Sequence, residues 1–253
     1  MALNGKFKTK IWETAIKRSL VKKSPKLNPI YDGLLGDEKE WKKAKYKIMW
    51  VLKEPYDDFT EIKKQPCGGD WSFYDEIAEA DVKDDNYFPF GKKRKSKNTW
   101  LNMLYVSYGI LEEKEDLKNE FCEAENKQDD LDILKKIAVI NMSKMPGPIK
   151  TINSELQKKF LFWKDVVIEQ IHSYNPNIII FGGTFEFFKE EEKNLGLKSN
   201  QSPCFEEYES NKHKSIIYKT KNAILIDTFH PMRINHKCAN LILKGIKDIK
   251  RNK

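Results

Sequence analysis

The sequence predicts an α/β fold: a three-layer α/β/α domain around a central, mainly parallel four-stranded sheet. Two observations lead to this prediction. Short continuous apolar runs, typical of strands buried on both faces, occur at residues 48–52, 137–141, 177–183 and 223–227. Segments with the apolar spacing of helices lie between or after them, at 100–111, 156–174 and 239–250. Strands that alternate with helices indicate a parallel sheet with helices on both faces.

The remaining segments are interpreted in chain order. The first 40 residues are polar and are expected to be helical, with an amphipathic helix between residues 10 and 23. Residues 57–98 form a connection rich in charge, aromatic residues and glycine, and connections of this length are usually functional or carry small helices. Residues 112–132 are charged and are expected to form a solvated helical excursion. Residues 215–219 are expected to pair with 223–227.

The domain prediction is a single unit over residues 1–253, with an N-terminal helical segment at about 1–45 and insertions at about 57–98 and 112–135. No run of 18 apolar residues occurs, so no membrane contact is expected. The first ten residues are polar and lysine-bearing and lack the apolar centre of a signal peptide, which predicts a cytoplasmic protein. We expect a monomer.

The cysteines argue against a metal centre. The sequence has 4 of them, scattered over the chain, and none forms a close pair, although zinc and iron–sulfur sites normally use at least one. We therefore expect no metal and no cofactor. The formal net charge of +8 favours an anionic partner, and nucleic acid is the commonest one.

Residues of chemical type follow the four apolar runs. Glu54 comes two residues after the first run, Asn141 closes the second, Gly182 and Gly183 close the third, and His230 follows the last. Because parallel strands present their carboxyl ends at one edge, where ligands bind in open α/β sheets, we expect these residues to lie together.

The same segments resemble the uracil-DNA glycosylase superfamily. Residues 52–57, Leu-Lys-Glu-Pro-Tyr-Asp, are similar to the family's water-activating motif Gly-Gln-Asp-Pro-Tyr-His. Residues 139–141 match a strand that ends in a base-reading asparagine, and residues 181–184 are similar to Trp-Gly-Ser. Residues 230–234, His-Pro-Met-Arg-Ile, match His-Pro-Ser-Pro-Leu. Order and rough spacing agree over residues 47–240, whereas the departures fall at the base pocket.

The resemblance implies a monofunctional DNA glycosylase, which flips a base out of DNA and hydrolyses its N-glycosidic bond. Glu54 would orient or deprotonate the attacking water and stabilise the positively charged sugar. His230, as a neutral imidazole, would donate a hydrogen bond to the departing base. Structural roles remain open for both residues: an ion-pair glutamate and a loop-ordering histidine.

Base recognition is assigned to five residues by the same resemblance. Asn141 would read a pyrimidine edge, and Tyr56 would form a wall beside C5 of the base. Lys53 stands where the family has a glutamine near the base. Either Trp71 or Phe73 would stack on the base, with a slight preference for Phe73. A turn asparagine and core aromatic residues are the structural alternatives.

DNA contacts are predicted from basic and apolar residues near these motifs. A basic run would bind phosphates without reading sequence, and comprises Lys92, Lys93, Arg94, Lys95 and Lys97. Arg233 and His236 would contact flanking phosphates, and Ile234 would wedge into the duplex. The alternative for the basic run is a solvated loop.

Two further readings of function stay open. The chain could be a DNA-binding or interaction protein on the same fold without catalysis, or a small-molecule α/β enzyme such as a nucleotide hydrolase. Neither GxGxxG nor a Walker sequence supports the latter. For a glycosylase, the substrate could be uracil, in repair, or a modified pyrimidine such as hypermodified cytosine in phage DNA. The altered pocket motif favours the modified pyrimidine.

Overall fold

The structure is a computed structural model that describes residues 2–17, 20, 22–23, 26–55, 68–81, 83–84, 89, 96–114, 117, 127–147, 151–191, 193–196, 201–208 and 214–251. Its helices are α1 (Leu3–Lys17), α2 (Glu38–Lys43), α3 (Phe73–Ala78), α4 (Lys97–Leu111), α5 (Lys127–Leu134), α6 (Asn153–Tyr174) and α7 (His236–Arg251), with 3₁₀ turns η2 (Phe185–Glu191) and η4 (Pro231–Arg233). Its strands are β1 (Lys22–Lys23), β2 (Lys26–Leu27), β3 (Gly33–Leu34), β4 (Ile48–Leu52), β5 (Ile137–Asn141), β6 (Ile178–Gly182), β7 (Phe205–Tyr208), β8 (Lys214–Lys219) and β9 (Ile224–Thr228).

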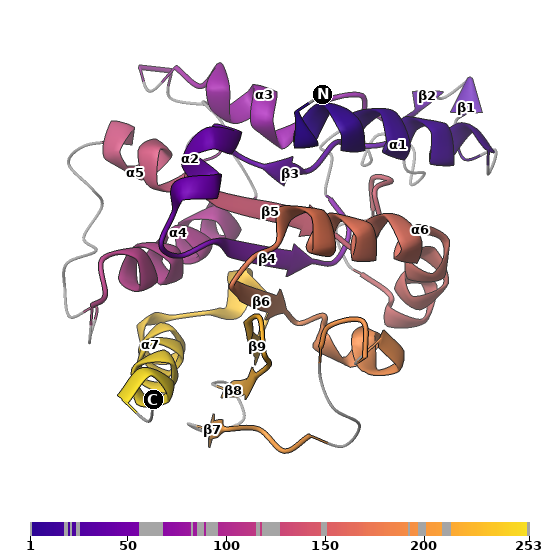
Figure 1. Ribbon diagram of the computed structural model, residues 1–253. Helices are drawn as coiled ribbons and strands as arrows, with labels where there is room; N and C mark the ends of the chain where they lie inside the picture. The colour runs from indigo at the N-terminus through magenta and orange to yellow at the C-terminus, as the bar shows by residue number, and fades with distance from the viewer. Residues whose placement is uncertain are drawn as a thin grey trace.

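The fold is α/β with a mixed seven-stranded sheet in the order β3-β5-β4-β6-β9-β8-β7 (Figure 1). Strands β5, β4, β6 and β9 are parallel to one another, and antiparallel strands extend the sheet on both sides. The predicted hairpin of β8 and β9 is confirmed. The prediction of four strands is wrong, because β3, β8 and β7 extend the four parallel strands to seven. Strands β3 and β7 form the two edges of the sheet. An edge strand is paired on one side only, so it needs no apolar run: β3 is two residues long and β7 contains two glutamates.

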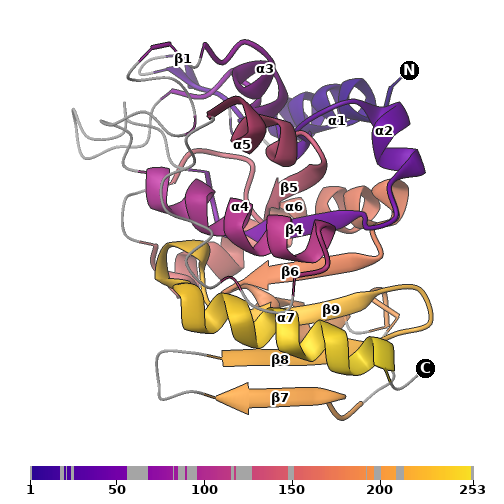
Figure 2. The same cartoon turned by 90° about the vertical axis from the view of Figure 1, so that its left-hand side faces the viewer.

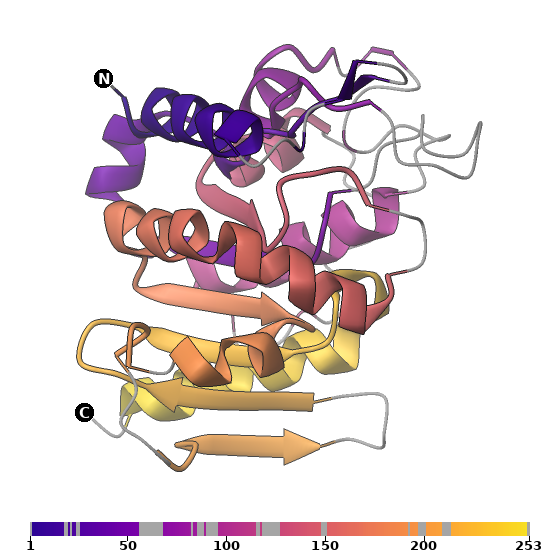
Figure 3. The ribbon, with the colours of Figure 1, turned by 90° about the vertical axis from the view of Figure 1, so that its right-hand side faces the viewer.

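Helices cover both faces of the sheet. Figure 2 shows α4 and α7 in front of one face, and Figure 3 shows α1 and α6 on the other. Side chains of β4 alternate between the two cores: Trp50 packs with the α4 and α7 residues, and Met49 packs with the α1 and α6 residues. Strands β4, β5 and β6 are buried along their whole length, which explains their uninterrupted apolar sequences. None of the helices in the described ranges has the length and apolarity that crossing a bilayer requires.

The N-terminal prediction needs two corrections. The first helix spans Leu3–Lys17 instead of residues 10–23. Its buried residues Phe7, Ile11 and Ala15 recur every four positions, which is the spacing that buries one helical face. Beyond it, residues 26–34 are not helical, since they contain β2 and β3. Backbone hydrogen bonds tie this extended segment to residues 68–73, from Asn28 N to Gly68 O (2.9 Å) and from Tyr31 N to Trp71 O (2.9 Å).

Thr184, which follows β6, is not the cap of an α-helix. The segment that follows is the 3₁₀ turn η2, and the Thr184 hydroxyl donates instead to the Val51 carbonyl of β4 (2.8 Å). Thr184 is fully buried. Its hydrogen bond therefore attaches the exit of β6 to the neighbouring strand close to Glu54.

Candidate functional site at the carboxyl edge of the sheet

The strand register brings the predicted acid and imidazole to the same level of one sheet edge. Leu52 pairs with Asn141, and Gly182 pairs with Thr228, at the last positions of their strands. Val51 and Phe181 are also partners, so Leu52 and Gly182 stand level. Glu54 and His230 each follow two residues later. Since only β6 separates β4 from β9, the two residues leave the sheet about 10 Å apart, or two strand spacings.

Glu54 is held against the backbone of the neighbouring chain segment. The β4–β5 ladder continues past the strands, with hydrogen bonds from Ser143 N to Lys53 O (3.2 Å) and from Gly147 N to Pro55 O (2.9 Å). A Cβ atom on Gly147 would overlap the Glu54 side chain, so only glycine leaves room for the carboxylate. Glu54 Oε2 is buried and has no hydrogen-bond partner in the described structure.

Burial raises the pKa of the Glu54 carboxyl above its ordinary value. Three nearby groups act in the opposite direction: the charges of Lys159 and Lys53, and hydrogen bonding from Thr151. Glu54 therefore combines the basicity of a desolvated carboxylate with cationic neighbours that favour its ionised form. Both properties suit a general base.

His230 is a neutral hydrogen-bond donor. Burial, together with the charges of Lys53 and Arg233, lowers the pKa of its imidazole to about 4. The backbone N–H of Met232 donates to Nδ1 (3.3 Å), so in the neutral ring the proton is assigned to Nε2. Among the residues that the structure describes, none pairs with Nε2. The ring can therefore donate one hydrogen bond without carrying a charge.

The charge of Lys53 acts on both Glu54 and His230. Its ammonium donates to Asn153 Oδ1 (3.1 Å) at the start of α6. The same charge opposes the rise that burial causes in the pKa of Glu54, and it adds to the fall that burial causes in the pKa of His230. One lysine thus favours an ionised carboxylate and a neutral imidazole together, and base binding by Lys53 stays a prediction.

Two glycines allow the His-Pro turn to pack on the end of β6. A Cβ atom on Gly182 would lie 2.8 Å from Cδ of Pro231 and 2.9 Å from Cδ2 of Leu52. Gly183 has a φ of +69° and donates its N–H to the Thr228 carbonyl (2.8 Å). Asn102 of α4 holds the turn from the other side, donating to the Pro231 carbonyl (2.7 Å).

Asn141 lies beside a buried ion pair. Its backbone N–H and its Nδ2 both donate to Asp32 Oδ2, at 2.7 Å and 3.2 Å. Lys144 Nζ donates to both Asp32 oxygens, at 2.8 Å each, and to Gln170 Oε1 at 2.7 Å. The side chains of Asp32 and Lys144 are 0% exposed, and Asn141 is 2% exposed. Asn141 is thus held rigidly, with little of its surface accessible.

The predicted stacking residues differ in accessibility. Phe73 is 6% exposed and packs edge-on against Trp100, with ring centroids 5.3 Å apart. Trp71 is half-buried and leans on Phe73 at 5.3 Å. Three successive left-handed residues, Gly68, Gly69 and Asp70, turn the chain into this pair. Trp71 is therefore the more accessible of the two rings, whereas Phe73 belongs to the core.

The prediction for Ile234 needs correction. Ile234 is 4% exposed and packs into the core with residues of α4 and α7. A core side chain cannot wedge into a duplex. Met232, two residues earlier, is 63% exposed and occupies the outer side of the same turn. Arg233 and His236 are exposed beside it, and the His236 ring lies 5.6 Å from that of Tyr105.

Part of the predicted site lies outside the described residues: Tyr56 and the basic residues Lys92, Lys93, Arg94 and Lys95. Lys97 is half-buried at the start of α4. The structure adds residues that the sequence analysis missed: Asp32, Lys144, Gly147, Asn153 and Lys159. None stands in a recognisable motif, and they reach the site through contacts between segments far apart in the chain. Only the Pro-Gly pair before residue 148 signalled a special backbone position.

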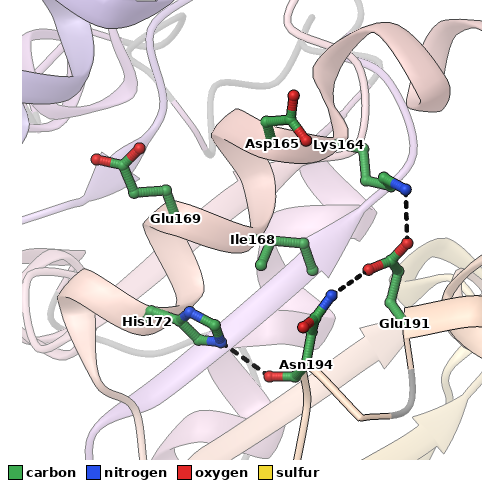
Figure 4. Close-up of a pocket in the computed structure, with 7 residues that line it drawn as sticks. All are labelled: Lys164, Asp165, Ile168, Glu169, His172, Glu191 and Asn194. Atoms are coloured by element: carbon green, nitrogen blue, oxygen red, sulfur yellow. Dashed lines mark hydrogen bonds and ion pairs between the residues drawn. The ribbon is translucent and has the colours of Figure 1, made fainter.

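A hollow of the described surface lies away from Glu54 and His230. It has a volume of about 340 Å³ and lies between α6 and η2 (Figure 4). Four of its polar residues form two pairs: Lys164 with Glu191 at 2.8 Å, and His172 Nε2 with the Asn194 carbonyl at 2.8 Å. Within the described ranges, no three His, Cys, Asp or Glu side chains converge as metal ligands.

Comparison with known proteins assigns no family to the chain, so a function can be argued only from its motifs and its geometry. No family model matches the chain, and no curated protein is significantly similar to it.

The His230 imidazole should titrate with a pKa of about 4 in an NMR titration of its Cε1–H signal. Lys53→Met removes one of the charges that disfavour the imidazolium, so it should raise this pKa. Lys159→Met is the matched control, because that charge acts on Glu54. Since unfolded histidine binds its proton near pH 6.5, the free energy of unfolding should fall as the pH drops from about 6.5 to about 4. A wild-type pKa near 6.5 contradicts this account.

Asp32→Asn should lower the free energy of unfolding by about 3–5 kcal/mol, because it leaves the Lys144 ammonium buried without a counter-charge. Adding Lys144→Met should recover most of the loss. Urea denaturation measures both effects. Ser107→Ala is the control, since it leaves one neutral buried N–H, that of Trp50 Nε1, without its acceptor (3.1 Å) and should cost about 1–3 kcal/mol. An Asp32→Asn effect as small as the control's would mean that the pair is not buried as ions.

Proposed function

We propose that this protein is a DNA glycosylase of the uracil-DNA glycosylase type. It would take uracil or a modified pyrimidine, such as a hypermodified cytosine, out of DNA and hydrolyse its N-glycosidic bond. One observation carries the proposal. Glu54 and a neutral His230 leave the carboxyl edge of the sheet at the same level, with only β6 between their strands. The ordered motifs that resemble the superfamily support the same conclusion.

Each group suits one end of the breaking bond. Glu54 accepts a proton from water while the water oxygen bonds to C1′ of the sugar, and its negative charge stabilises the cationic sugar. The C1′–N bond breaks, and its electron pair leaves with the base. His230 donates its Nε2–H to the base oxygen on which negative charge develops. The products are an abasic sugar and the free base, which takes up a proton from solvent.

The surface around the His-Pro turn suits DNA. Arg233 supplies a cation for a phosphate, and the exposed Met232 supplies an apolar side chain that can enter the stack where the base has left it. Lys97 lies at the start of α4, whose Asn102 holds the same turn. Together with the net charge of +8, this arrangement favours nucleic acid as the substrate.

Glu54→Gln should abolish base release, by at least about a hundredfold, because the amide cannot take the proton from water. Oligonucleotides carrying uracil, a thymine mismatch or hypermodified cytosine are incubated with both proteins, and abasic sites are scored by alkaline cleavage. DNA binding, measured by fluorescence anisotropy, should stay within about threefold, since the glutamine keeps the shape of the site. Binding by the wild type without cleavage of any substrate would instead favour the non-catalytic DNA-binding protein.

Gly147→Ala should lower base release at least about tenfold while DNA binding is retained, because the added methyl group displaces the Glu54 carboxylate. Gly109→Ala is the matched control. Its methyl group meets Leu243 at 2.7 Å in the core, so it disturbs packing without touching Glu54. Equal activity losses in the two variants, at equal melting temperature, would mean that Gly147 does not position the acid.

A further inference from the structure

We propose that Asp32 and Lys144 are positioning residues that fix the carboxamide of Asn141, with its nitrogen towards Asp32 and its oxygen free to accept a hydrogen bond from the base. The proposal rests on the proposed function, in which Asn141 reads the base. It also specifies the edge of the base that Asn141 recognises: an edge with a hydrogen-bond donor, which Oδ1 accepts.

The first step concerns the charge of Lys144. Its Nζ has three acceptors at hydrogen-bond distance: both oxygens of Asp32 at 2.8 Å and Gln170 Oε1 at 2.7 Å. An ammonium group has three N–H donors and satisfies all three acceptors, whereas a neutral amine has only two. Burial lowers the pKa of the Lys144 ammonium, and the charge and hydrogen bond of Asp32 act in the opposite direction. The three contacts fit an ammonium group beside a carboxylate.

The second step concerns the orientation of Asn141. An ionised carboxylate is an acceptor only, so an amide oxygen cannot face it favourably. At Asp32 Oδ2 the amide must present Nδ2, at 3.2 Å, and the backbone N–H of Asn141 anchors the same oxygen at 2.7 Å. Gln170 Nε2 holds Oδ1 of Asp32 at 3.0 Å, so the carboxylate cannot turn away. The buried ion pair thus determines which way the asparagine points.

The amide oxygen of Asn141, Oδ1, is the side-chain atom that does not face Asp32. Oδ1 of Asn141 accepts no hydrogen bond from any residue that the structure describes. Side chains alternate along β5, so Asn141 points to the same face as Val139, which belongs to the core beneath α4 and α7. Pro231 of the His-Pro turn packs on that face too, against the Cα of Gly182. A base that contacts Asn141 would therefore offer a donor to Oδ1: N3–H in uracil, or the 4-amino group in a cytosine.

The test uses Asp32→Asn combined with Lys144→Met, which makes the cluster neutral and leaves no unpaired charge. A neutral amide at position 32 can donate as well as accept, so it no longer forces one orientation of Asn141. The activity probes are DNA with uracil against DNA with 3-deazauracil, which lacks the N3–H donor. If the wild type releases only a cytosine-type base, that base is compared with its N4,N4-dimethyl form. Discrimination within the pair should fall at least about tenfold.

A second measurement needs no activity. In protein labelled with ¹⁵N at asparagine, the Asn141 side-chain NH₂ signal, assigned by its loss in Asn141→Asp, should exchange with solvent far more slowly than the signal of exposed Asn153. The double variant should abolish that protection. Ser107→Ala, which weakens the same core without touching Asn141, should change neither the exchange nor the discrimination.

The outcomes separate the two proposals. Slow exchange in the wild type, with loss of protection and of discrimination in the folded double variant, supports the positioning role. Fast exchange in the wild type overturns it, even if the variant does not fold. Unchanged discrimination in a folded double variant overturns it as well. If the wild type releases no base from any DNA, the proposed function fails, and the exchange measurement still decides the role of Asp32 and Lys144.

Discussion

The parallel hydrogen-bond register of β4, β6 and β9 is the constraint on which the candidate site depends. Parallel pairing starts all three strands at one edge and ends them at the other, so the residue after each strand is delivered to a common level. Glu54 and His230 are separated by 176 positions in the chain, yet they leave the sheet on either side of β6. The rigidity of the buried strands then holds two groups of opposite chemical role at a spacing of molecular size.

The protonation states at this edge follow from packing. Burial alone would favour a protonated Glu54 and a neutral His230. The ammonium of Lys53, tied to Asn153 at the start of α6, opposes the first effect and reinforces the second. Glycine at position 147 lets the backbone approach Glu54 closely, and glycine at position 182 leaves room for Pro231, which follows His230. The site is therefore built as much by residues that leave room, or that carry a charge nearby, as by the acid and the imidazole.

Several differences between expectation and structure have one physical origin. A helix start, an edge strand or a core side chain is selected by contacts with distant segments, and no local pattern records those contacts. Ile234 illustrates this: its place after the His-Pro pair suggested a wedge, but the turn η4 directs it into the core and exposes Met232. Phe73 is a second example: the sequence does not record that its ring packs against Trp100 in the core. In β7, pairing with β8 along the backbone is sufficient to form a strand from a charged sequence.

The sequence by itself determined the α/β class, the four buried parallel strands and the residues at their ends. Continuous apolar runs have no stable alternative to burial between helices, and parallel strands must end together. Only the tertiary structure decided the sheet edges, the neutral state of His230, the desolvation of Glu54 and the buried pair of Asp32 and Lys144 behind Asn141. These properties arise from burial and from contacts between segments far apart in the chain, such as Asp32 and Lys144, which are 112 positions apart. Spacing within a sequence does not encode them.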